Sequence, residues 1–360
     1  MAKAKQVKEE IQGAVSTDSL EIAMKAVEKK YGKNVVGAAN SFQLKNISVI
    51  PTSSILLNMR LGRGGFVRGR VVEVFGPQQS GKTSLCLDIT ANAQRIALEN
   101  KSSERSLWVD AERQFDEEFA ESYKVDTDRL ILLKNKDAEA ILDSAETLIR
   151  SGTIDVAVID SVAALSPRAE MSAAIDEQHM MLHPRLMSAA LRRLTPLCSE
   201  TRTLLVFINQ IRSSPNMYAP DVTTGGNALK YYTSYRLDVS GGTSQKSRIK
   251  EGNVVIGHKV LVKTVKNRLA HPFQECTIDL LYGEGFDTKG EVISLAESFG
   301  ILSKDGTWYS YDGELVGQGV NNVKNTFIEK PELYNAVREK VLAVINDVDI
   351  TLEPDESSSE

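Results

Sequence analysis

Residues 76–83 read Gly76-Pro77-Gln78-Gln79-Ser80-Gly81-Lys82-Thr83, which fits the pattern G-x-x-x-x-G-K-S/T. An apolar run, Val71–Phe75, leads into this stretch, and a helix predicted over Thr83–Ile96 leads out of it. Glycines let backbone N–H groups turn toward phosphate oxygens, and the start of the helix adds the positive end of its dipole. Lys82 can neutralise the β- and γ-phosphates, and the Thr83 hydroxyl can ligate Mg²⁺. The stretch therefore predicts a P-loop that binds ATP with Mg²⁺.

Short apolar runs alternate with helical stretches around this loop. The predicted strands are Val71–Phe75, Leu107–Asp110, Leu130–Leu133, Val156–Ile159 and Leu204–Ile208. The predicted helices between them are Thr83–Ile96, Ala138–Arg150 and Leu186–Cys198. Continuous apolar runs are typical of strands buried on both faces of a parallel sheet, and their alternation with helices favours an α/β core. Three later runs are expected to extend the sheet, partly antiparallel, at Tyr235–Val239, Lys259–Lys266 and Cys276–Leu281.

Four segments follow from these patterns: a helix within 1–44, the core over 45–283, a small α+β domain over 284–346 and an acidic segment over 347–360. In the first segment, four apolar residues recur at helical spacing, namely Leu20, Met24, Val27 and Tyr31. In the third, a helix, a hairpin turn and a second helix are expected at Glu291–Phe299, Asp312-Gly313 and Pro331–Val344. The last segment holds no Lys, Arg or aromatic residue, which favours disorder.

The composition of the 360 residues, 42% hydrophobic and 25% charged, is typical of soluble globular proteins. No apolar run reaches the ~18 residues that a membrane span needs, and no secretory signal is visible, so a cytoplasmic protein is expected. Cys86, Cys198 and Cys276 stand alone in apolar segments, which predicts buried packing and no zinc site. The net charge is −5, but without the six acidic residues of 347–360 the remaining chain has 43 basic against 48 − 6 = 42 acidic residues. A nucleic-acid partner is therefore not excluded.

Polar side chains follow three further predicted strands. Asp160 ends one of them, where a carboxylate can hold Mg²⁺ through water. Asp110 and Glu112 follow the strand after the P-loop helix, and from spacing alone they are equal candidates for orienting the water that attacks the γ-phosphate. Asn209 and Gln210 follow the third strand and precede a segment rich in turn formers. The residues alone thus indicate a P-loop ATPase with an irregular loop near the nucleotide.

The motifs taken together, in their order and spacing, resemble the RecA family of bacterial recombinases over about residues 26–344. The segments that carry the resemblance are 76–83, 160–165, 207–212, 223–230, 265–268 and 281–285. The resemblance implies a RecA-like P-loop core, a mostly parallel central sheet and a single-stranded-DNA-dependent ATPase. Such a protein forms a helical filament, a homo-oligomer, on single-stranded DNA and exchanges strands with homologous double-stranded DNA in recombination and repair. A phage-encoded or divergent member of the family fits the same motifs.

The resemblance also implies roles around the nucleotide. It favours Glu112 over Asp110 as the water-activating carboxylate and makes Gln210 the residue that senses the γ-phosphate. Lys266 and Arg268 match two cations that reach the ATP of the neighbouring subunit; the family usually has Lys at the second position, and Arg keeps the charge. The resemblance also makes Lys82 catalytic, assigns the metal to Thr83 and Asp160, and places Phe119 where it stacks on adenine. The full set of implied cofactor-binding residues is Gly76, Pro77, Gln78, Gln79, Ser80, Gly81, Lys82, Thr83, Ser84, Asp116, Phe119 and Asp160.

Two loops that line the DNA axis of the filament in this family match about Glu170–Met181 and Ile211–Thr224. Cations, backbone amides and apolar side chains in such loops can grip phosphates and separate bases. The second loop is shorter than is usual, with Pro215 and Pro220 in unfamiliar positions, and Gln78-Gln79 stands where the family usually has Glu-Ser. The implied DNA-binding residues are Arg168, Met180, Arg185, Arg212, Met217, Tyr218, Thr224, Gly225, Gly226 and Asn227.

Two other functions are compatible with a P-loop: a ring-forming motor such as a replicative helicase, and an ATP-binding scaffold without catalysis. The C-terminal motifs argue against the first, and the intact Lys82, Glu112 and Asp160 argue against the second. The resemblance further suggests LexA-like repressors, whose self-cleavage would be stimulated in the SOS response, and single-stranded-DNA-binding protein as partners. The acidic segment is expected either to aid solubility or to compete with DNA for basic surfaces.

Overall fold

The computed structural model describes residues 19–33, 35–37, 48–135, 137–173, 181–212, 222–242 and 244–347. The chain divides into two compact units, residues 1–47 and 48–360. In the first unit a helix spans residues 19–31, as the apolar spacing predicts. Its end is closed by Gly32, whose N–H donates to the carbonyl of Glu28 over 2.9 Å at a φ of 106°. Leu20, Ile22 and Tyr31 on this helix are exposed.

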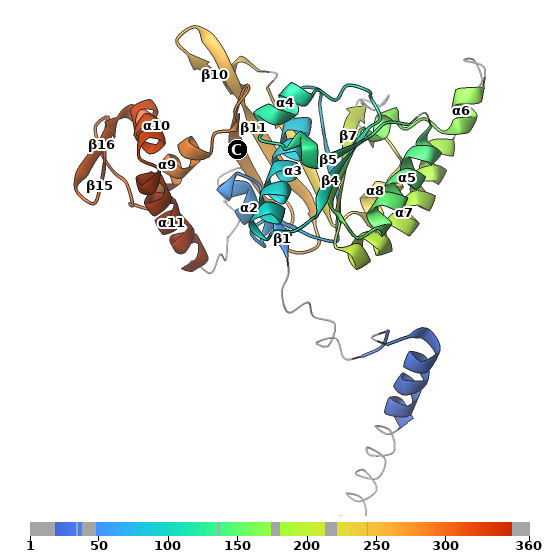
Figure 1. Cartoon of the computed structure of the whole chain (residues 1–360). Helices are drawn as coiled ribbons and strands as arrows, with labels where there is room; N and C mark the ends of the chain where they lie inside the picture. The colour runs from blue at the N-terminus through green and yellow to red at the C-terminus, as the bar shows by residue number, and fades with distance from the viewer. Residues whose placement is uncertain are drawn as a thin grey trace, which may run out of the picture. The chain divides into compact units, whose positions relative to one another are not determined.

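The second unit is built on a sheet whose central six strands run parallel in the order β9-β3-β7-β6-β4-β5. Figure 1 labels β4, β5 and β7 of this sheet. These strands are β3 (Val71–Gly76), β4 (Arg105–Asp110), β5 (Leu130–Leu133), β6 (Ile154–Asp160), β7 (Leu204–Arg212) and β9 (Tyr235–Gly241). Each strand predicted in the parallel part is present, so the α/β interpretation of the alternating pattern is confirmed.

Helices cover both faces of the sheet, and alternate strand residues divide between them. Val72 and Val74 of β3 pack with α3 (Lys82–Glu99), whereas Val71 packs in a second cluster with α5 (Ala138–Arg150) and α7 (Leu182–Thr201). This two-sided burial explains why the strands read as continuous apolar runs. The three cysteines are free and buried, as their apolar surroundings predict. Among the described helices, none is long and apolar enough to cross a membrane.

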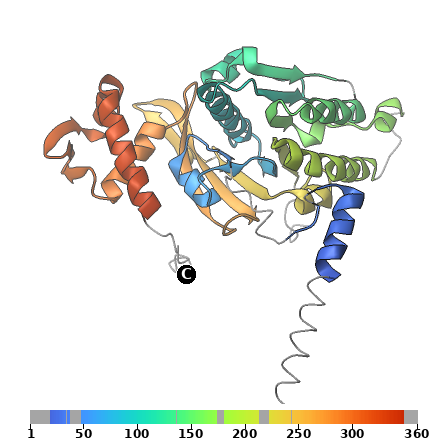
Figure 2. The same ribbon diagram turned by 60° about the horizontal axis from the view of Figure 1, so that its bottom comes forward.

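An antiparallel extension follows β9. It contains β11 (Val254–Asn267), β12 (Glu275–Leu281) and β13 (Gly285–Phe286), with β10 (Arg248–Glu251) pairing with β11. The shorter elements around the core are β1 (Val49–Ile50), α2 (Ile55–Leu61), β2 (Phe66–Val67), α4 (Glu117–Ser122), α6 (Arg168–Ser172), β8 (Val222–Thr223) and α8 (Asn227–Tyr232). Figure 2 shows α5 and α7 toward one end of this sheet and the C-terminal elements at the other.

The C-terminal elements form a small α+β arrangement that is bonded to α2. They are α9 (Thr288–Ser298), β14 (Ser303–Asp305), β15 (Trp308–Tyr311), β16 (Glu314–Gln318), α10 (Gly319–Glu329) and α11 (Pro331–Asp347). The predicted turn at Asp312-Gly313 joins β15 and β16, and both residues have positive φ, as a tight hairpin needs. The carboxylate of Glu291 on α9 accepts hydrogen bonds of 2.6 and 2.8 Å from the Ser54 hydroxyl and the Ile55 N–H.

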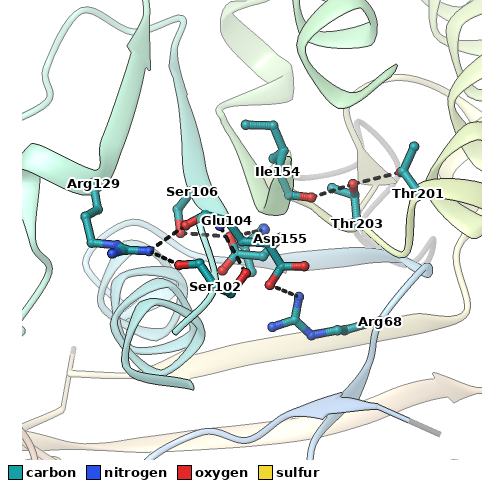
Figure 3. Close-up of polar contacts among 10 residues, drawn as sticks. Arg68, Ser102, Glu104, Ser106, Arg129, Ile154, Asp155, Thr201 and Thr203 are labelled. Carbon is teal, nitrogen blue, oxygen red and sulfur yellow. Dashed lines mark hydrogen bonds and ion pairs between the residues drawn. The ribbon is translucent and has the colours of Figure 1, made fainter. Parts of the chain in front are cut away.

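A polar network lies at the amino ends of β4, β6 and β7 (Figure 3). The Ser106 hydroxyl donates to Oδ1 of Asp155 over 3.0 Å, and the Thr203 hydroxyl donates to the Ile154 carbonyl over 2.7 Å. Asp155 is almost completely buried, and this burial raises the pKa of its carboxyl to about 6. The network joins the amino ends of these strands, whereas the P-loop lies at the carboxyl end of the sheet.

Candidate active site

The P-loop joins the carboxyl end of β3 to the start of α3, as the motif predicts. Gly76 has a φ of 157°, and a Cβ there would lie 1.9 Å from the carbonyl oxygen of Val239, so only glycine fits. Gly81 precedes α3, and no side chain caps that helix. The hydroxyl oxygen of Ser80 is buried and has no hydrogen-bond partner among the described residues. Uncapped N–H groups and an unsatisfied buried hydroxyl fit a bound phosphate chain.

Lys82 is the cation of this loop. Its Nζ donates to the carbonyl of Pro77, and burial lowers the pKa of the ammonium while Asp160 and Glu112 oppose that shift. The Pro77 carbonyl therefore holds the ammonium within the loop, close to where the motif places the β- and γ-phosphates. A short swing of a flexible side chain would bring the charge onto them.

Thr83 and Asp160, which the sequence predicts as a metal-binding pair, lie next to each other in the structure. The Thr83 hydroxyl lies 3.5 Å from Oδ2 of Asp160. Burial, followed by the nearby charges of Glu112 and Asp110, raises the pKa of Asp160 to about 7. A divalent cation would relieve this repulsion, and a hydroxyl with a carboxylate is an oxygen donor set that suits Mg²⁺. In the described part of the chain no group of three or more His, Cys, Asp or Glu side chains could hold a metal alone, so phosphates and water must complete the coordination.

The structure separates Asp110 from Glu112. The carboxylate of Asp110 is buried and accepts hydrogen bonds from the N–H groups of Gln114 (2.9 Å) and Phe115 (3.3 Å), so it shapes the loop after β4. Oε1 of Glu112 instead accepts hydrogen bonds from the Ser161 hydroxyl and, over 3.1 Å, from Nε2 of Gln210.

These bonds connect neighbouring parts of the site. Ser161 follows Asp160 through a cis peptide bond, and Gln210 lies on β7. The water-activating candidate, the predicted metal ligand and the implied γ-phosphate sensor are therefore brought together at the carboxyl ends of β4, β6 and β7.

Two cavities flank the first turn of α3. One, of about 230 Å³, is lined by Glu112, Asp160 and the two implied adenine residues, Asp116 and Phe119; the other, of about 440 Å³, is lined by the P-loop. Thr83 and Phe119 line both. A nucleotide that reached from one cavity into the other would thus pass the Thr83 hydroxyl and the Phe119 ring.

The aromatic wall contains a residue that sequence reasoning missed. The Asp116 carboxylate caps α4 by accepting the N–H of Phe119 over 3.0 Å. The Phe119 ring is 41% exposed and packs edge-on against Tyr123, with 5.1 Å between ring centres. The Tyr123 hydroxyl donates to the Ser84 hydroxyl over 2.8 Å, which fixes the ring beside the P-loop helix. The i,i+4 spacing of the two aromatic residues was the available signal.

A buried polar network continues from the site into the sheet. Glu73, in the middle of β3, is fully buried, and its carboxylate accepts hydrogen bonds from Arg236 Nε (2.5 Å) and Asn209 Nδ2 (2.9 Å). The same Asn209 amide donates to the carbonyl of Thr224 over 2.8 Å. Asn209 precedes Gln210, so this network ties the P-loop strand to the far end of the second predicted DNA loop. The lone carboxylate in an apolar strand was its only signal in the sequence.

The ends of the two predicted DNA loops lie side by side. A Cβ on Gly225 would lie 3.7 Å from the ring of His183, and one on Gly226 would lie 3.1 Å from Cβ of Pro184. Thr224, Gly225, Gly226 and Asn227 thus gather where the second loop ends and α8 begins, close to the start of α7, which carries the exposed Arg185.

The other predicted DNA-binding residues have different positions. Arg168 makes a two-pronged ion pair with Asp137, at 3.2 and 3.3 Å. Arg212 is the last residue of β7, where its backbone pairs with Val222 of β8. Met180, Met217 and Tyr218 lie outside the described residues.

Lys266 and Arg268 lie far from the P-loop of their own chain. Lys266 on β11 is paired with Arg236 on β9, and Arg236 is paired with Glu73 on β3. Glu73 comes before the P-loop in the sequence of β3. Both side chains donate to the carbonyl of Tyr231 at the carboxyl end of α8 (3.3 and 3.1 Å). Burial, with Arg268 and Arg236, lowers the pKa of Lys266 to about 8. The two cations therefore lie beside the amino end of β9, whereas the P-loop follows the carboxyl end of β3.

Comparisons with known proteins identify the family of the chain. The model of the RecA N-terminal domain matches residues 18–287, and that of the RecA C-terminal domain matches residues 290–346. The chain is 44% identical to Protein RecA of Methylococcus capsulatus and 43% identical to that of Geobacter sulfurreducens. These alignments cover 90% and 91% of this chain, and 93% and 94% of the relatives. The chain therefore belongs to the RecA family, and it is a DNA-dependent ATPase and a recombinase.

Proposed function

We propose that the site between β3, β4 and β6 hydrolyses ATP in response to DNA held by the loops that follow β6 and β7. The observation that carries this proposal is the 3.1 Å hydrogen bond from Gln210 to Glu112. Gln210 is two residues before Arg212, where β7 ends and the second loop begins. A shift of this strand end on DNA binding would therefore move the partner of the water-activating carboxylate.

The residues of the chain divide the chemistry among them. Bound Mg²⁺ would neutralise charge on the transferred phosphoryl group, with Thr83 and Asp160 holding it. Lys82 would leave the Pro77 carbonyl and place its charge on the phosphates. Oε1 of Glu112 is occupied by Ser161 and Gln210, which leaves Oε2 to accept a proton from the attacking water.

A neighbouring subunit would complete the pocket. Lys266 and Arg268 face the wrong end of the sheet to reach the P-loop of their own chain, but in a head-to-tail assembly they can reach the P-loop of the next one. Such an interface repeats into a helical filament when the rotation does not close. The exposed apolar residues of the helix over 19–31 support an assembly role for that unit.

The experiment that tests this function is a strand-exchange assay with homologous and heterologous duplexes, run beside ATP turnover at several protein concentrations with and without single-stranded DNA. We expect exchange only with the homologous duplex, and turnover per subunit that rises with both DNA and protein concentration. Turnover that is independent of DNA and constant on dilution would eliminate the filament mechanism. Closed hexamers that unwind DNA would identify a ring-forming motor instead.

The proposal includes a cytoplasmic location, because the resemblance to the family suggests it. For the same reason it includes two protein partners, namely LexA-like repressors and single-stranded-DNA-binding protein. Incubation of a purified repressor with the DNA-bound, ATP-bound protein should give two repressor fragments. A repressor that stays intact while strand exchange proceeds would remove this partner without affecting the recombinase assignment.

A further inference from the structure

A large cavity lies outside the nucleotide site, where the C-terminal elements meet the core. Its volume is about 740 Å³, and its walls come from α2, from the connection between β11 and β12, and from the last turns of α11. Arg60, Arg63, His271 and Arg338 belong to the lining, and among the described residues no Asp or Glu lines it. The wall therefore carries three permanent positive charges and no compensating negative charge.

The guanidinium groups of this cavity lack the partners that arginines find elsewhere in the chain. Arg60 Nη1 donates to Gln274 over 3.3 Å, but Arg60 Nε is buried and has no hydrogen-bond partner in the described part of the chain. Arg63 Nε makes one long bond, of 3.4 Å, to the Leu269 carbonyl. Within the described ranges, none of the ion pairs of 4.0 Å or less involves Arg60, Arg63 or Arg338. A buried donor without an acceptor is costly, so the cavity is built to accept an anion.

We propose that this cavity binds the carboxylates of residues 348–360 of the same chain. Helix α11 ends at Asp347, and Ile345 and Asn346 are already part of the cavity wall, so the segment begins at the rim. It carries five acidic residues and no Lys or Arg: Asp349, Asp355, Glu353, Glu356 and Glu360. At about 3.4 Å per extended residue, every one of these carboxylates can reach the cavity.

Chemistry and tethering both favour this occupant. Arginine presents its N–H groups as a planar fork that matches a carboxylate, and such charge-assisted bonds are stronger than neutral ones. A short tether also holds the segment near the cavity at an effective concentration of about millimolar or more, so the segment competes well with a free anion for the arginines. The docked segment would join α11 to α2 and so brace the C-terminal elements against the core. Salt would weaken this contact, because the cavity is open enough to be screened.

Carbodiimide cross-linking tests the contact in the full-length chain. Arg60→Lys and Arg63→Lys keep the positive charge and supply an amine, which the reagent joins directly to a touching carboxylate. Arg192→Lys, at an exposed position of α7, is the matched control. We expect amide links from position 60 or 63 to residues 349–360 within single chains, fading at high salt, and none from position 192. Equal yields at all three positions, or links only between chains, would overturn the proposal.

A second measurement separates the acidic segment from other anions. In the full-length chain, Arg60→Gln combined with Arg63→Gln should make cleavage of the segment by a glutamate-specific protease about tenfold faster, because the lost contacts no longer protect it. Lys101→Gln combined with Arg192→Gln removes the same charge at exposed positions and should leave cleavage unchanged. If the cavity variant instead cleaves at the control rate and binds duplex DNA more weakly, the cavity holds DNA phosphates, and the assignment to residues 348–360 is wrong. Retained ATP turnover would show that the variant is folded.

Discussion

The side-chain amide of Gln210 donates a 3.1 Å hydrogen bond to Oε1 of Glu112, across the end of β6, which lies between their two strands. The Ser161 hydroxyl, at the end of β6, donates to the same oxygen. One carboxylate oxygen is therefore shared by the strand that leads into the second predicted DNA loop and by the segment that follows Asp160, the predicted metal ligand. This sharing gives Glu112, the proposed catalytic carboxylate, a physical connection to both.

Replacing Glu112 should separate nucleotide binding from turnover. Glu112→Gln keeps an oxygen for Ser161 and Gln210 but cannot accept a proton, so we expect ATP turnover to fall by about 10²- to 10⁴-fold with nucleotide affinity retained. Steady-state hydrolysis and fluorescent-nucleotide binding would measure the two quantities. Glu117→Gln, in the exposed first turn of α4, is the control and should behave as the wild type. Unchanged turnover in Glu112→Gln would refute the assigned role.

Gln210→Ala removes the donor that links β7 to Glu112. We expect the low turnover without DNA to remain and its stimulation by single-stranded DNA to be lost, because the loop can no longer move the carboxylate through this bond. Turnover with increasing single-stranded DNA, with DNA binding measured in parallel, would show this. A variant that binds DNA normally and is still fully stimulated would exclude Gln210 as the link.

The proposal that a second subunit completes the site predicts complementation. Lys266→Ala and Glu112→Gln should each be inactive alone, but in a mixed filament some interfaces combine an intact Glu112 with an intact Lys266. Random assembly of equal amounts places both at about a quarter of the interfaces, so up to about a quarter of wild-type turnover should return. Turnover of the mixture should be compared with each protein alone. If mixing restores nothing, Lys266 acts within its own chain.

Much of the fold could be predicted from local patterns, because periodicity and motif context act over short stretches. The strands from Val71 to Ile208 and the helix over Ala138–Arg150 are where the apolar runs and spacing place them. Helix α10 was not predicted, since Gly319 and Asn residues disfavour helix. Burial of Val323 and Phe327, one turn apart, overrides that preference through packing.

The parts of the site that escaped prediction depend on contacts between distant residues. Asp110 and Glu112 are equivalent by spacing, and only the N–H groups that fold back onto Asp110 distinguish them. The pairing of Glu73 with Arg236 joins strands that are distant in the sequence but adjacent in the sheet. No periodicity encodes such a pair, so topology must be known first.

The buried pair of Glu73 and Arg236 should be costly to break. Glu73→Leu leaves a largely buried guanidinium without its partner, so we expect the free energy of unfolding to fall by about 3–5 kcal/mol. The double variant with Arg236→Met should recover much of this loss, because no unpaired charge remains. Urea unfolding of both singles and the double gives the coupling energy. The exposed pair Lys263–Glu275, at 3.1 Å, should couple by less than about 1 kcal/mol. Purely additive effects at Glu73 and Arg236 would contradict the argument.

Asp155 predicts a specific dependence of stability on pH. Burial raises the pKa of its carboxyl from the ordinary 3.8 to about 6, so between these values the folded state binds the proton more tightly than the unfolded state. The resulting stabilisation is fully present below about pH 4 and is lost as the pH rises through about 6. Two units of pKa correspond to about 3 kcal/mol at most.

Asp155→Asn tests this dependence because the amide oxygen still accepts the hydrogen bond of Ser106 but cannot ionise. We expect its free energy of unfolding, measured with urea between about pH 4 and pH 7, to fall less steeply than that of the wild type. The difference in free energy of unfolding between the two proteins should grow up to about pH 6 and then level off. The raised pKa values of Asp88 and Asp160 do not contribute to this difference, because the wild type and Asp155→Asn share them. Glu329→Gln, exposed on α10, should run parallel to the wild type. If the curve of Asp155→Asn also ran parallel to that of the wild type, the Asp155 carboxyl would already be ionised in the folded protein near pH 4. The positive charge of Arg68, which Figure 3 shows close by, would then lower the pKa of Asp155 as much as burial raises it.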